Sequence, residues 1–376
     1  MADGQTYDFL GLDVRDLSEL MADLLVAENL GFLNLFSEGM SPINVKHEWS
    51  QDDITAQQGA LTAAALIGDT NFVVADSSVF QVNDIITAVT PAGVSSLERQ
   101  RVTVIVDPTN ITVVRAVGAA AAAIPISSSL KIVSRPQVEN NKTFATSTTQ
   151  PTTDFNYTEI FEASVEISNT QQTVKSYAMG SNTIAYQEML RMKEIMVLLN
   201  RALIWGVPFA GTKSPVNPRR MGGLLNYATK TNLGAALDST TIVNDAAERI
   251  LRQGGRADAL VCNTDIARKI SAFNTGTSNL RTQLADRDAG SFVSRFVGDT
   301  PVSGIQMLVV DIDFPRDMLA VVDSSRLETN TLRPFVSLSG KKSDADDGIT
   351  RVIRGECTST WKNAAKVHEV IYNITL

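Results

Sequence analysis

Residues 180–224 read GSNTIAYQEMLRMKEIMVLLNRALIW followed by GVPFAGTKSPVNPRRMGGL, and this stretch is the most informative part of the sequence. In its first part apolar side chains recur at steps of three or four residues: Ala185, Met189, Met192, Met196, Leu199 and Leu203. This spacing predicts one apolar face of a helix, and Ser181 can cap the N-terminus. A helix from Ser181 to Trp205 would be about 37 Å long at ~1.5 Å per residue. Such a helix suits a flat, elongated subunit with a stiff backbone, although a single core helix gives the same pattern.

Composition narrows the classes of protein. The chain has 376 residues, of which 44% are hydrophobic and 20% are charged, as in ordered globular proteins with two or three domains. Its net charge of -8 disfavours tight electrostatic binding to nucleic acid over the whole surface. A container for DNA is still compatible, because a wall that held DNA strongly would hinder packaging and release.

The sequence gives little indication of a metal site, a signal peptide or a membrane-spanning helix. Cys262 and Cys357 stand alone, without metal-ligand spacing, and we expect both to be reduced and partly buried. The N-terminal residues MADGQTYDFLGLDVRDL carry acidic groups where a signal peptide carries basic ones. The small-residue run from Ala119 to Ala123 is far shorter than the ~20 residues of a membrane helix. We expect a soluble protein made in the cytosol.

Along the first half of the chain, the residue pattern changes from helical to strand-like and then to that of a connector. Residues 1–40 contain an amphipathic helix with Leu17, Leu20, Met21, Leu24 and Leu25 on one face, followed by the apolar stretch Gly31–Phe36. This segment packs either on another subunit or on its own core. Residues 60–136 predict a small barrel or sandwich of short strands: Phe72–Val74, Ile85–Val89, Arg101–Val106 and Ile111–Val114. The Ser/Thr-rich stretch from Thr143 to Thr153 predicts an extended connector, and Ile160–Val174 a strand.

The second half mixes helices and strands. We expect a helix at Thr240–Gln253 that stops at Gly254, a buried strand at residues 257–262, and another helix capped by Asn263. Further strands are expected at Ile305–Val310, Met318–Val322, Thr350–Ile353 and Val367–Ile374. This order of elements predicts an α+β fold.

The sequence lacks most of the residue patterns that are typical of catalytic sites. The two histidines, His47 and His368, are isolated, and we expect both on strand surfaces. Gly206–Ser214, GVPFAGTKS, approaches a phosphate-binding loop, but Thr212 separates the glycine from Lys213 and a helix precedes the loop instead of a strand. The carboxylates Asp344, Asp346 and Asp347 lack the spacing of a calcium loop. Arg219 and Arg220 can pair with carboxylates across an interface. We therefore expect no catalytic residue, metal or cofactor.

Several blocks, in order, resemble the major capsid proteins of tailed bacteriophages, in particular the subgroup with a β-rich insertion. Before and within the long helix the resembling residues are Asn156–Phe161, Val165, Ile167, Ser168, Thr170, Gly180, Tyr186–Gln187, Arg191 and Glu194. Those at the helix end and beyond are Ala202–Gly206, Arg220–Leu224, Leu332–Pro334, Glu356 and Asn363. The resemblance covers roughly residues 140–376 and is weaker through the β insertion.

The resemblance implies the tailed-phage capsid fold. The N-terminal arm would be residues 1–40, the extended loop 41–179 with a small inserted β-barrel at about 60–136, and the peripheral domain's long helix and following loop 180–221. Residues 222–332 would be the axial domain, and 333–376 closing strands that return to the peripheral domain. The connector would be a hinge during head expansion.

The resemblance also implies a function in assembly. Hexamers and pentamers of the chain would close into an icosahedral head around double-stranded DNA, made in the host cytoplasm and ending in the virion, with no membrane involved. Partners would be further copies, a separate scaffolding protein, a portal and a decoration protein. The residues expected at assembly interfaces are Phe32, Phe36, Arg191, Trp205, Arg219, Arg220 and Arg333. Two alternatives stay open: an encapsulin-like compartment with protein cargo, and a nucleotide hydrolase that uses Lys213.

Overall fold

The structure is a computed structural model in which the described residues are 30–53, 56–137, 139, 150–174, 183–239, 241–273, 293–294, 305, 307–339 and 347–375. The chain divides into two compact units. Residues 50–152 form one, here called the insertion unit, and residues 1–49 with 153–376 form the other, the main unit. The predicted helix at residues 17–25, the Ser181 cap, most of the connector, and Asp344 and Asp346 lie outside the described residues.

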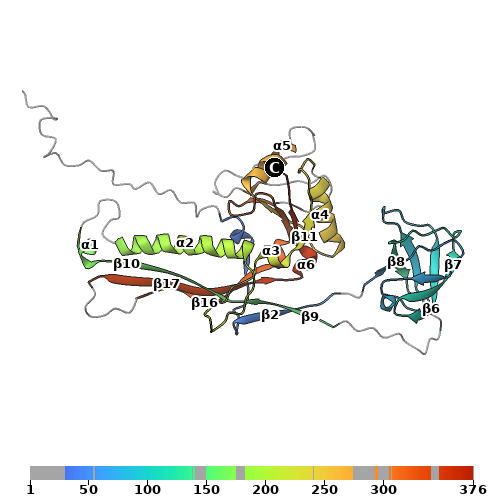
Figure 1. Ribbon diagram of the computed structural model, residues 1–376, viewed down its shortest axis with the longest axis horizontal. Coiled ribbons are helices and arrows are strands. Elements are labelled where there is room, and N and C mark those ends of the chain that lie inside the picture. The colour runs from blue at the N-terminus through green and yellow to red at the C-terminus, as the bar shows by residue number, and fades with distance from the viewer. Residues whose placement is uncertain are drawn as a thin grey trace, which may run out of the picture. The chain divides into compact units, whose positions relative to one another are not determined.

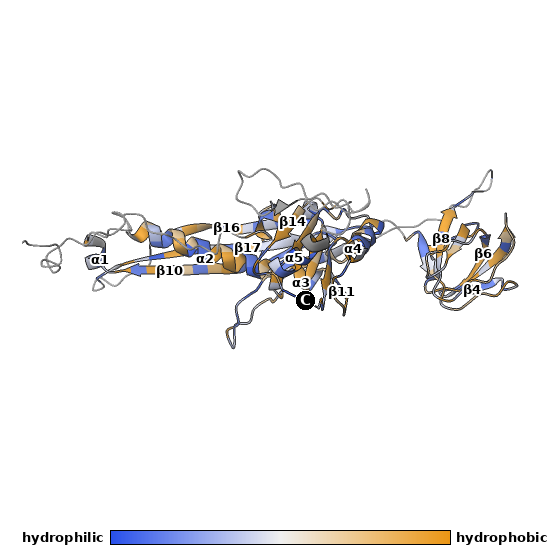
Figure 2. Cartoon of the chain, turned by 90° about the horizontal axis from the view of Figure 1, so that it is seen from above, coloured by the Kyte–Doolittle hydropathy of each residue, from blue (hydrophilic) through white to orange (hydrophobic). Residues whose placement is uncertain are grey.

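The predicted long helix is confirmed as α2 (Thr183–Trp205). Ile195, Leu199 and Leu203 are buried, so the C-terminal half of the apolar stripe faces the core. Its N-terminal half differs from the prediction, because Ala185 and Met189 are exposed. Figure 2 shows hydrophobic and hydrophilic residues alternating along α2, as expected for a helix with one buried side.

Beneath α2 lies a four-stranded sheet with strand order β1-β16-β17-β10 (Figure 1). Its strands are β1 (Ser37–Glu38), β10 (Glu159–Ile167), β16 (Leu327–Ser339) and β17 (Ile349–Trp361). Along β10, Phe161 and Val165 are buried, and Ile160 and Glu162 are exposed. This alternation is the signature of a sheet that packs a helix on one face and leaves the other face open.

A glycine turn fixes the chain that follows α2. The Gly206 N–H donates to Ala202 O at 2.9 Å, and the Gly223 N–H donates to Gly206 O at 2.9 Å. A Cβ at Gly223 would lie 2.5 Å from Leu203 O, so a larger residue does not fit against the end of the helix. The turn leads into α3 (Leu224–Tyr227).

The main unit also contains a six-stranded mixed sheet with order β11-β18-β15-β12-β14-β13. Its strands are β11 (Thr229–Asn232), β12 (Ala259–Cys262), β13 (Val293–Ser294), β14 (Met307–Val310), β15 (Leu319–Val322) and β18 (Glu369–Tyr372). Strand β12 is buried on both faces. Ala259 and Val261 join the core beside α2, and Leu260 and Cys262 join a second core. A continuous apolar run is therefore required there.

The second core lies beneath α4 (Thr241–Arg252) and α5 (Thr264–Phe273). Asn263 precedes α5 as predicted, and its Oδ1 accepts a hydrogen bond from Thr264 Oγ1 at 2.9 Å. The short helix α6 (Ala364–Val367) connects β17 to β18. Strand β18 pairs in parallel with β11 and antiparallel with β15.

The insertion unit contains an antiparallel sheet with order β3-β8-β5-β6-β7-β4. Its strands are β3 (Gln58–Ala60), β4 (Asn71–Val73), β5 (Ile85–Val89), β6 (Arg99–Asp107), β7 (Asn110–Val117) and β8 (Ser129–Ser134). The four predicted strands are confirmed, and β3 and β8 were not predicted. Phe72, Ile86, Ile111 and Leu130 form its core.

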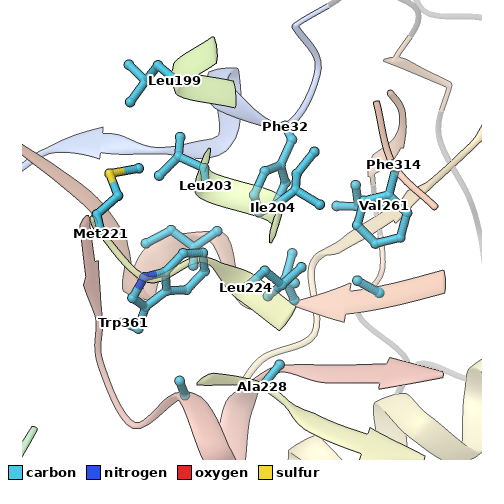
Figure 3. Packing of buried hydrophobic residues seen from close by; sticks show 14 of the residues in the cluster. Phe32, Leu199, Leu203, Ile204, Met221, Leu224, Ala228, Val261, Phe314 and Trp361 are labelled. Atoms are coloured by element: carbon cyan, nitrogen blue, oxygen red, sulfur yellow. The ribbon is translucent and has the colours of Figure 1, made fainter. Parts of the chain in front are cut away.

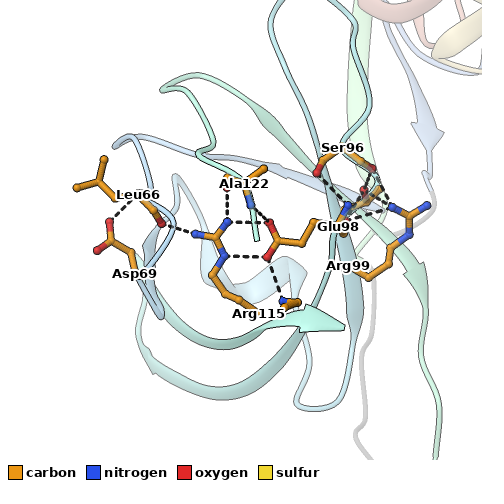
Figure 4. A network of polar contacts seen from close by, with 9 residues as sticks. Leu66, Asp69, Ser96, Glu98, Arg99, Arg115 and Ala122 are labelled. Carbon is orange, nitrogen blue, oxygen red and sulfur yellow. Dashed lines mark hydrogen bonds and ion pairs between the residues drawn. The ribbon is translucent and has the colours of Figure 1, made fainter. Parts of the chain in front are cut away.

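A buried ion pair between Glu98 and Arg115 holds the loop at Ala122 against the sheet of the insertion unit. Glu98 Oε2 lies 2.7 Å from Arg115 Nη2 and also accepts the Ala122 N–H at 3.0 Å (Figure 4). Arg115 donates in turn to the carbonyl oxygens of Leu66 and Ala122. Burial alone would raise the pKa of Glu98, but the Arg115 and backbone hydrogen bonds outweigh it and lower the pKa to about 2.

Three predictions need correction. The strand expected at Ile160–Val174 ends at Ile167, because the Ser168 hydroxyl accepts the Gln171 N–H and begins α1 (Asn169–Thr173). β17 continues eight residues beyond the predicted end at Ile353. His368 was expected on a strand surface but is 1% exposed. Its Nδ1 accepts the Asp323 N–H at 3.3 Å, and burial lowers its pKa to about 4.

Candidate assembly interface

Residues 207–220 form a backbone hairpin between Gly206 and Gly223, and this segment is called the hairpin below. Backbone hydrogen bonds pair Phe209 with Arg220 at 3.0 and 3.1 Å, and Thr212 with Asn217 at 2.9 and 3.0 Å. The prolines and Gly211 (φ +81°) in this stretch favour tight turns over a helix or strand. Val216 at its tip is 86% exposed. The hairpin is therefore an ordered projection with an apolar tip.

Buried polar groups at the strand junction of β9 (Thr152–Tyr157) and β10 hold the base of the hairpin. Asn156 Nδ2 donates to the carbonyl oxygens of Gly222 (3.1 Å) and Ser359 (2.9 Å), and Asn156 Oδ1 accepts the Gly222 N–H at 2.7 Å. Glu159 Oε2 accepts the Met221 N–H at 2.9 Å. Burial nevertheless raises the pKa of Glu159. These contacts fix the direction in which the hairpin leaves the sheet.

Glu356 on β17 gathers cations from two other segments. Its Oε1 lies 2.7 Å from Arg219 Nη2 and accepts the Thr158 hydroxyl at 2.7 Å, and its Oε2 lies 2.8 Å from Arg333 Nη2. Burial by itself would raise the pKa of Glu356, but the hydrogen bonds from Thr158 and Arg333 and the charges of both arginines lower it. One buried carboxylate therefore ties the hairpin and β16 to β17.

An aromatic cluster around Trp361 holds Phe32 and Phe36 within the main unit. Trp361 stacks on Phe32 and Tyr227, with ring centroids 6.5 and 6.0 Å apart, and meets the edges of Phe36 and His368 at 5.3 and 6.1 Å. Figure 3 shows Phe32 beside Ile204 and Leu203 of α2, in the same core as Trp361. The stretch 31–36 thus packs on its own chain, which was one of the two interpretations open from the sequence.

The seven residues expected at interfaces have different surroundings. Phe32 is fully buried and Phe36 is partly buried in the aromatic cluster. Arg219 and Arg333 meet at Glu356. The structure does not bring the other three residues together. Arg191 pairs with Glu194, Trp205 is half-exposed, and the Arg220 guanidinium lies 5.1 Å from the centre of the Phe209 ring.

Sequence reasoning missed three residues that organise these contacts: Asn156, Glu356 and Trp361. Asn156 and Glu356 are polar side chains, and Trp361 follows the polar run Thr358–Thr360, so the burial of these residues could not be inferred from local hydrophobicity. Asn156 and Glu356 did fall in the blocks that resemble capsid proteins, which was the available signal. Asn156 contacts Gly222, 66 residues away along the chain, and Glu356 contacts Arg219, 137 residues away; Arg333 is nearer, at 23 residues from Glu356.

A single copy leaves several large apolar side chains exposed on the main unit. On the face of the sheet opposite Phe161, Ile160 is 46% exposed, Val336 44% and Leu338 49%. Others lie in the segment before β2 (Lys46–Gln51) and in the hairpin: Met40, Ile43, Val207 and Val216. Exposed patches of this kind mark surfaces that contact other molecules.

Three further features of the described residues concern nucleotide, metal and small-molecule binding. The N–H groups of Thr212 and Asn217 bond to each other's carbonyl oxygens, so the backbone near Lys213 does not surround a phosphate as a nucleotide loop does. No cluster of three potential metal ligands occurs in the described ranges. A cavity of about 60 Å³ is lined by Arg249 and Glu369, but these two already form an ion pair. Within the same ranges, no helix has the length and hydropathy to cross a membrane.

The fold is similar to those of solved phage and GTA-particle structures. The capsid of the native GTA particle superimposes with a TM-score of 0.54 at 10% identity, covering 100% of both chains. The capsid of the empty GTA particle gives 0.53 at 10% identity, covering 97% of this chain and 96% of that one. The structure from Mycobacterium phage Cain gives 0.51 at 11% identity, covering 99% of this chain and 98% of that one. These identities show a shared fold.

No curated protein matches the chain. The family described as SU10 major capsid protein matches residues 3–375, nearly the whole sequence. This match favours a phage shell over the encapsulin-like compartment and the nucleotide hydrolase. The chain therefore belongs to the SU10 major capsid protein family, and it is a shell-forming major capsid protein with the capsid fold of tailed phages.

Proposed function

We propose that copies of this chain form hexamers and pentamers that close into an icosahedral head around double-stranded DNA. The match to the major capsid family over residues 3–375 is the observation that carries this proposal. The chain acts by assembling with other copies and not by catalysing a reaction. The protein is made in the host cytoplasm and then enters the virion.

The contacts between copies use surfaces that one copy leaves apolar and exposed. The hairpin tip at Val216 and the open face with Val336 and Leu338 are the first of these surfaces. Arg191 and Arg220 add cations that can pair with carboxylates of a neighbour. Arg219, Arg333, Phe32 and Phe36 act indirectly, because they fix the hairpin and the arm to the main unit. Weak contacts of this kind add up when they are repeated around a closed shell.

The parts of the family fold map onto the chain as follows. The insertion unit belongs to the extended loop, residues 41–179, and the six-stranded sheet with α4 and α5 belongs to the axial domain. α2 and the sheet beneath it form the peripheral domain. The axial domain, proposed for 222–332, also takes in β18 through its pairing with β15.

Further partners are a separate scaffolding protein, a portal and a decoration protein. The chain's net charge of -8 supports non-specific and weak contact with packaged DNA, because a strongly basic inner wall would retain it.

Expression of the full chain, alone and together with a candidate scaffolding protein, tests this proposal by electron microscopy after size exclusion. Closed shells, tubes or hexamers support it. A homogeneous monomer or dimer under both conditions contradicts it. Shells that contain protein cargo and never DNA in the infected cell would instead favour a compartment.

A further inference from the structure

The outward side chains of strands β5, β6, β7 and β8 in the insertion unit are basic. These four strands contain four cations and one carboxylate, whereas the whole chain has a net charge of -8. One of the cations, Arg115, pairs with the buried Glu98, and Figure 4 shows Arg99 on the other side of Glu98. Arg99, Arg101 and Lys131 therefore remain as an excess of positive charge on an acidic chain.

The alternation of burial places these three side chains on one side of the sheet. Gln100 on β6 is fully buried, so its neighbours Arg99 and Arg101 point to the outside. Leu130 on β8 is fully buried in the same way, so Lys131 also points to the outside. Strands β8, β5 and β6 follow one another in the sheet. The three outward cations thus share one face.

Thr87 on β5 lies between two of these cations. It is the register partner of Lys131, and its Oγ1 accepts a hydrogen bond from Arg99 Nη1 at 3.0 Å. Because neighbouring strands are ~4.8 Å apart, the backbones of Lys131 and Arg99 are about 10 Å apart, and Arg101 is about 7 Å further along β6. The Debye length at physiological salt is roughly 8 Å, so the three charges act together on a ligand at this face.

The carboxylates nearest in sequence do not neutralise this face. Glu98 and Asp84 have buried side chains that are already paired with other arginines. Asp107 lies at the far end of β6, about 20 Å from Arg101 at ~3.3 Å per residue, where it accepts the Thr109 N–H at 2.8 Å. Among the described residues, the three outward cations have no ion pair. Their charges are available to a partner.

Exposed aliphatic side chains surround the cations. Val114 on β7 is the register partner of Arg101 and is about half-exposed. Val104, further along β6, and Val133, two residues from Lys131 on β8, are also about half-exposed. We call these three valines together with Arg99, Arg101 and Lys131 the basic face.

We propose that the basic face binds a separate partner protein through a segment in which carboxylates alternate with aliphatic side chains. The cations pair with the carboxylates and the valines cover the aliphatic groups, so both kinds of side chain on the face are matched. Two copies of this chain that met through the same face would bring cations against cations, which disfavours that pairing. The assembly surfaces proposed above lie on the main unit, so binding at the basic face does not depend on them.

Nucleic acid fits this face less well than an acidic protein. The four strands contain no aromatic residue on which a base could stack. Affinity for nucleic acid grows with the number of phosphates that are neutralised, and this face offers three cations with valines between them. The mixture of charge and aliphatic surface is therefore better suited to a protein.

Fluorescence anisotropy with a short labelled peptide of alternating glutamate and valine tests the proposal on the full chain. We expect saturable binding that weakens at high salt, because the attraction is electrostatic. A peptide with glutamine in place of glutamate, and one with serine in place of valine, should each bind about tenfold more weakly or worse. Absence of binding by the first peptide, or equal binding by either control peptide, would overturn the proposal.

Charge reversal locates the binding. Arg101→Glu with Lys131→Glu changes two exposed side chains, so the melting temperature should stay close to the native value while the peptide affinity falls about tenfold or more. The matched control, Arg252→Glu with Lys230→Glu, makes the same change in net charge on the main unit and should leave the affinity unchanged. Equal losses in these two variants would overturn the assignment to the basic face.

A milder variant keeps this test valid if the charge-reversed chain does not fold. Arg101→Gln with Lys131→Gln removes both charges without adding carboxylates, and it should also weaken binding of the glutamate peptide. Unchanged affinity in this folded variant would count against the proposal.

Two further outcomes would assign the face to a different partner. A thymidine oligonucleotide of the same charge that bound more tightly than the glutamate and valine peptide would indicate a nucleic-acid site and overturn the proposal. Loss of shell formation in Arg101→Glu with Lys131→Glu, but not in the control, would indicate a contact between copies and overturn the assignment to a separate protein. The peptide assay needs no shell, so its result is separate from that of the assembly test.

Discussion

Arg333 and Glu356 occupy facing positions on β16 and β17, and the guanidinium of Arg333 lies 2.8 Å from the carboxylate of Glu356. The same carboxylate binds Arg219 at the base of the hairpin at 2.7 Å. Because the Glu356 side chain is 5% exposed, its charge depends on these two arginines and Thr158 for compensation. The pair therefore connects the sheet to the hairpin that we propose as an assembly surface.

Replacing Glu356 by glutamine should lower the free energy of unfolding by about 2 kcal/mol, since hydrogen bonds to charged groups contribute roughly 1.5–3 kcal/mol. Urea unfolding of the soluble subunit measures this change. Glu162→Gln is the control on the same sheet, because Glu162 pairs with Arg354 and is 45% exposed. Its loss should cost at most about 1 kcal/mol. Equal costs for the two variants would contradict the buried role of Glu356.

Gly223→Ala should destabilise the end of α2 strongly. A Cβ there would lie 2.5 Å from Leu203 O and 2.6 Å from Ala202 O, and these backbone atoms cannot rotate away. We expect a loss of about 3 kcal/mol or more, at the upper end for overpacked sites. Gly68→Ala is the control, since nothing lies within 4 Å of its added Cβ. The melting temperatures of both variants measure the difference, and similar values would refute the close approach.

Glu98 should make the insertion unit sensitive to acid. Its pKa is lowered to about 2, so its contribution to stability is fully present above the unfolded value of about 4.5 and is lost as pH falls toward 2. Unfolding measured from pH 6 to pH 2.5 should therefore show a steeper loss in the native chain than in Glu98→Gln. Asp69→Asn, which changes a surface contact to the Leu66 N–H, serves as control and should keep the native slope. Parallel curves for the native chain and Glu98→Gln would contradict this account.

His368 should add a second acid response at higher pH. Its pKa is lowered to about 4 in the folded chain, so between pH 6.5 and 4 the unfolded state binds a proton that the folded state does not. Stability should fall by about 3 kcal/mol as pH decreases through this range. His368→Asn retains an acceptor for the Asp323 N–H and should remove most of that pH dependence. Denaturant unfolding at pH 7 and pH 4 measures it, and an unchanged dependence in the variant would count against the buried neutral histidine.

Val216→Asp should separate assembly from folding. Val216 is 86% exposed at the hairpin tip, so the substitution should change the free energy of unfolding by no more than about 0.5 kcal/mol. We expect fewer closed shells by light scattering and sedimentation, because a charge would enter an apolar contact between copies. Lys213→Gln is the control, because it changes a residue at the same tip without introducing a carboxylate. Normal shell yield with Val216→Asp would remove the hairpin tip from the proposed interfaces.

Periodicity predicted the elements whose burial follows hydrophobicity. The stripe through Leu199 and Leu203 gave α2, and the continuous apolar run at residues 259–262 gave β12. β17 was predicted too short because its second half, with Glu356, Thr358 and Thr360, buries polar side chains that bond to other segments. A single sequence does not reveal such partners.

The candidate site was less predictable than the fold. Arg219 and Arg333 were both predicted to lie at an assembly interface. Their shared contact with Glu356 could not be predicted, because Arg219 and Glu356 are 137 residues apart in the sequence. His368 was placed on a strand surface because the polar residues around it hide the aromatic packing of Trp361. In both cases the deciding interactions are long-range hydrogen bonds and ring contacts, which have no local period.

Assembly into a closed shell can be tested by electron microscopy of the purified full chain, expressed alone and together with a candidate scaffolding protein. We expect closed shells whose surface lattice resolves into hexamers and pentamers, with one copy of this chain at each subunit position. Particles that stay monomeric or dimeric under both conditions, at concentrations well above those in an infected cell, would contradict it.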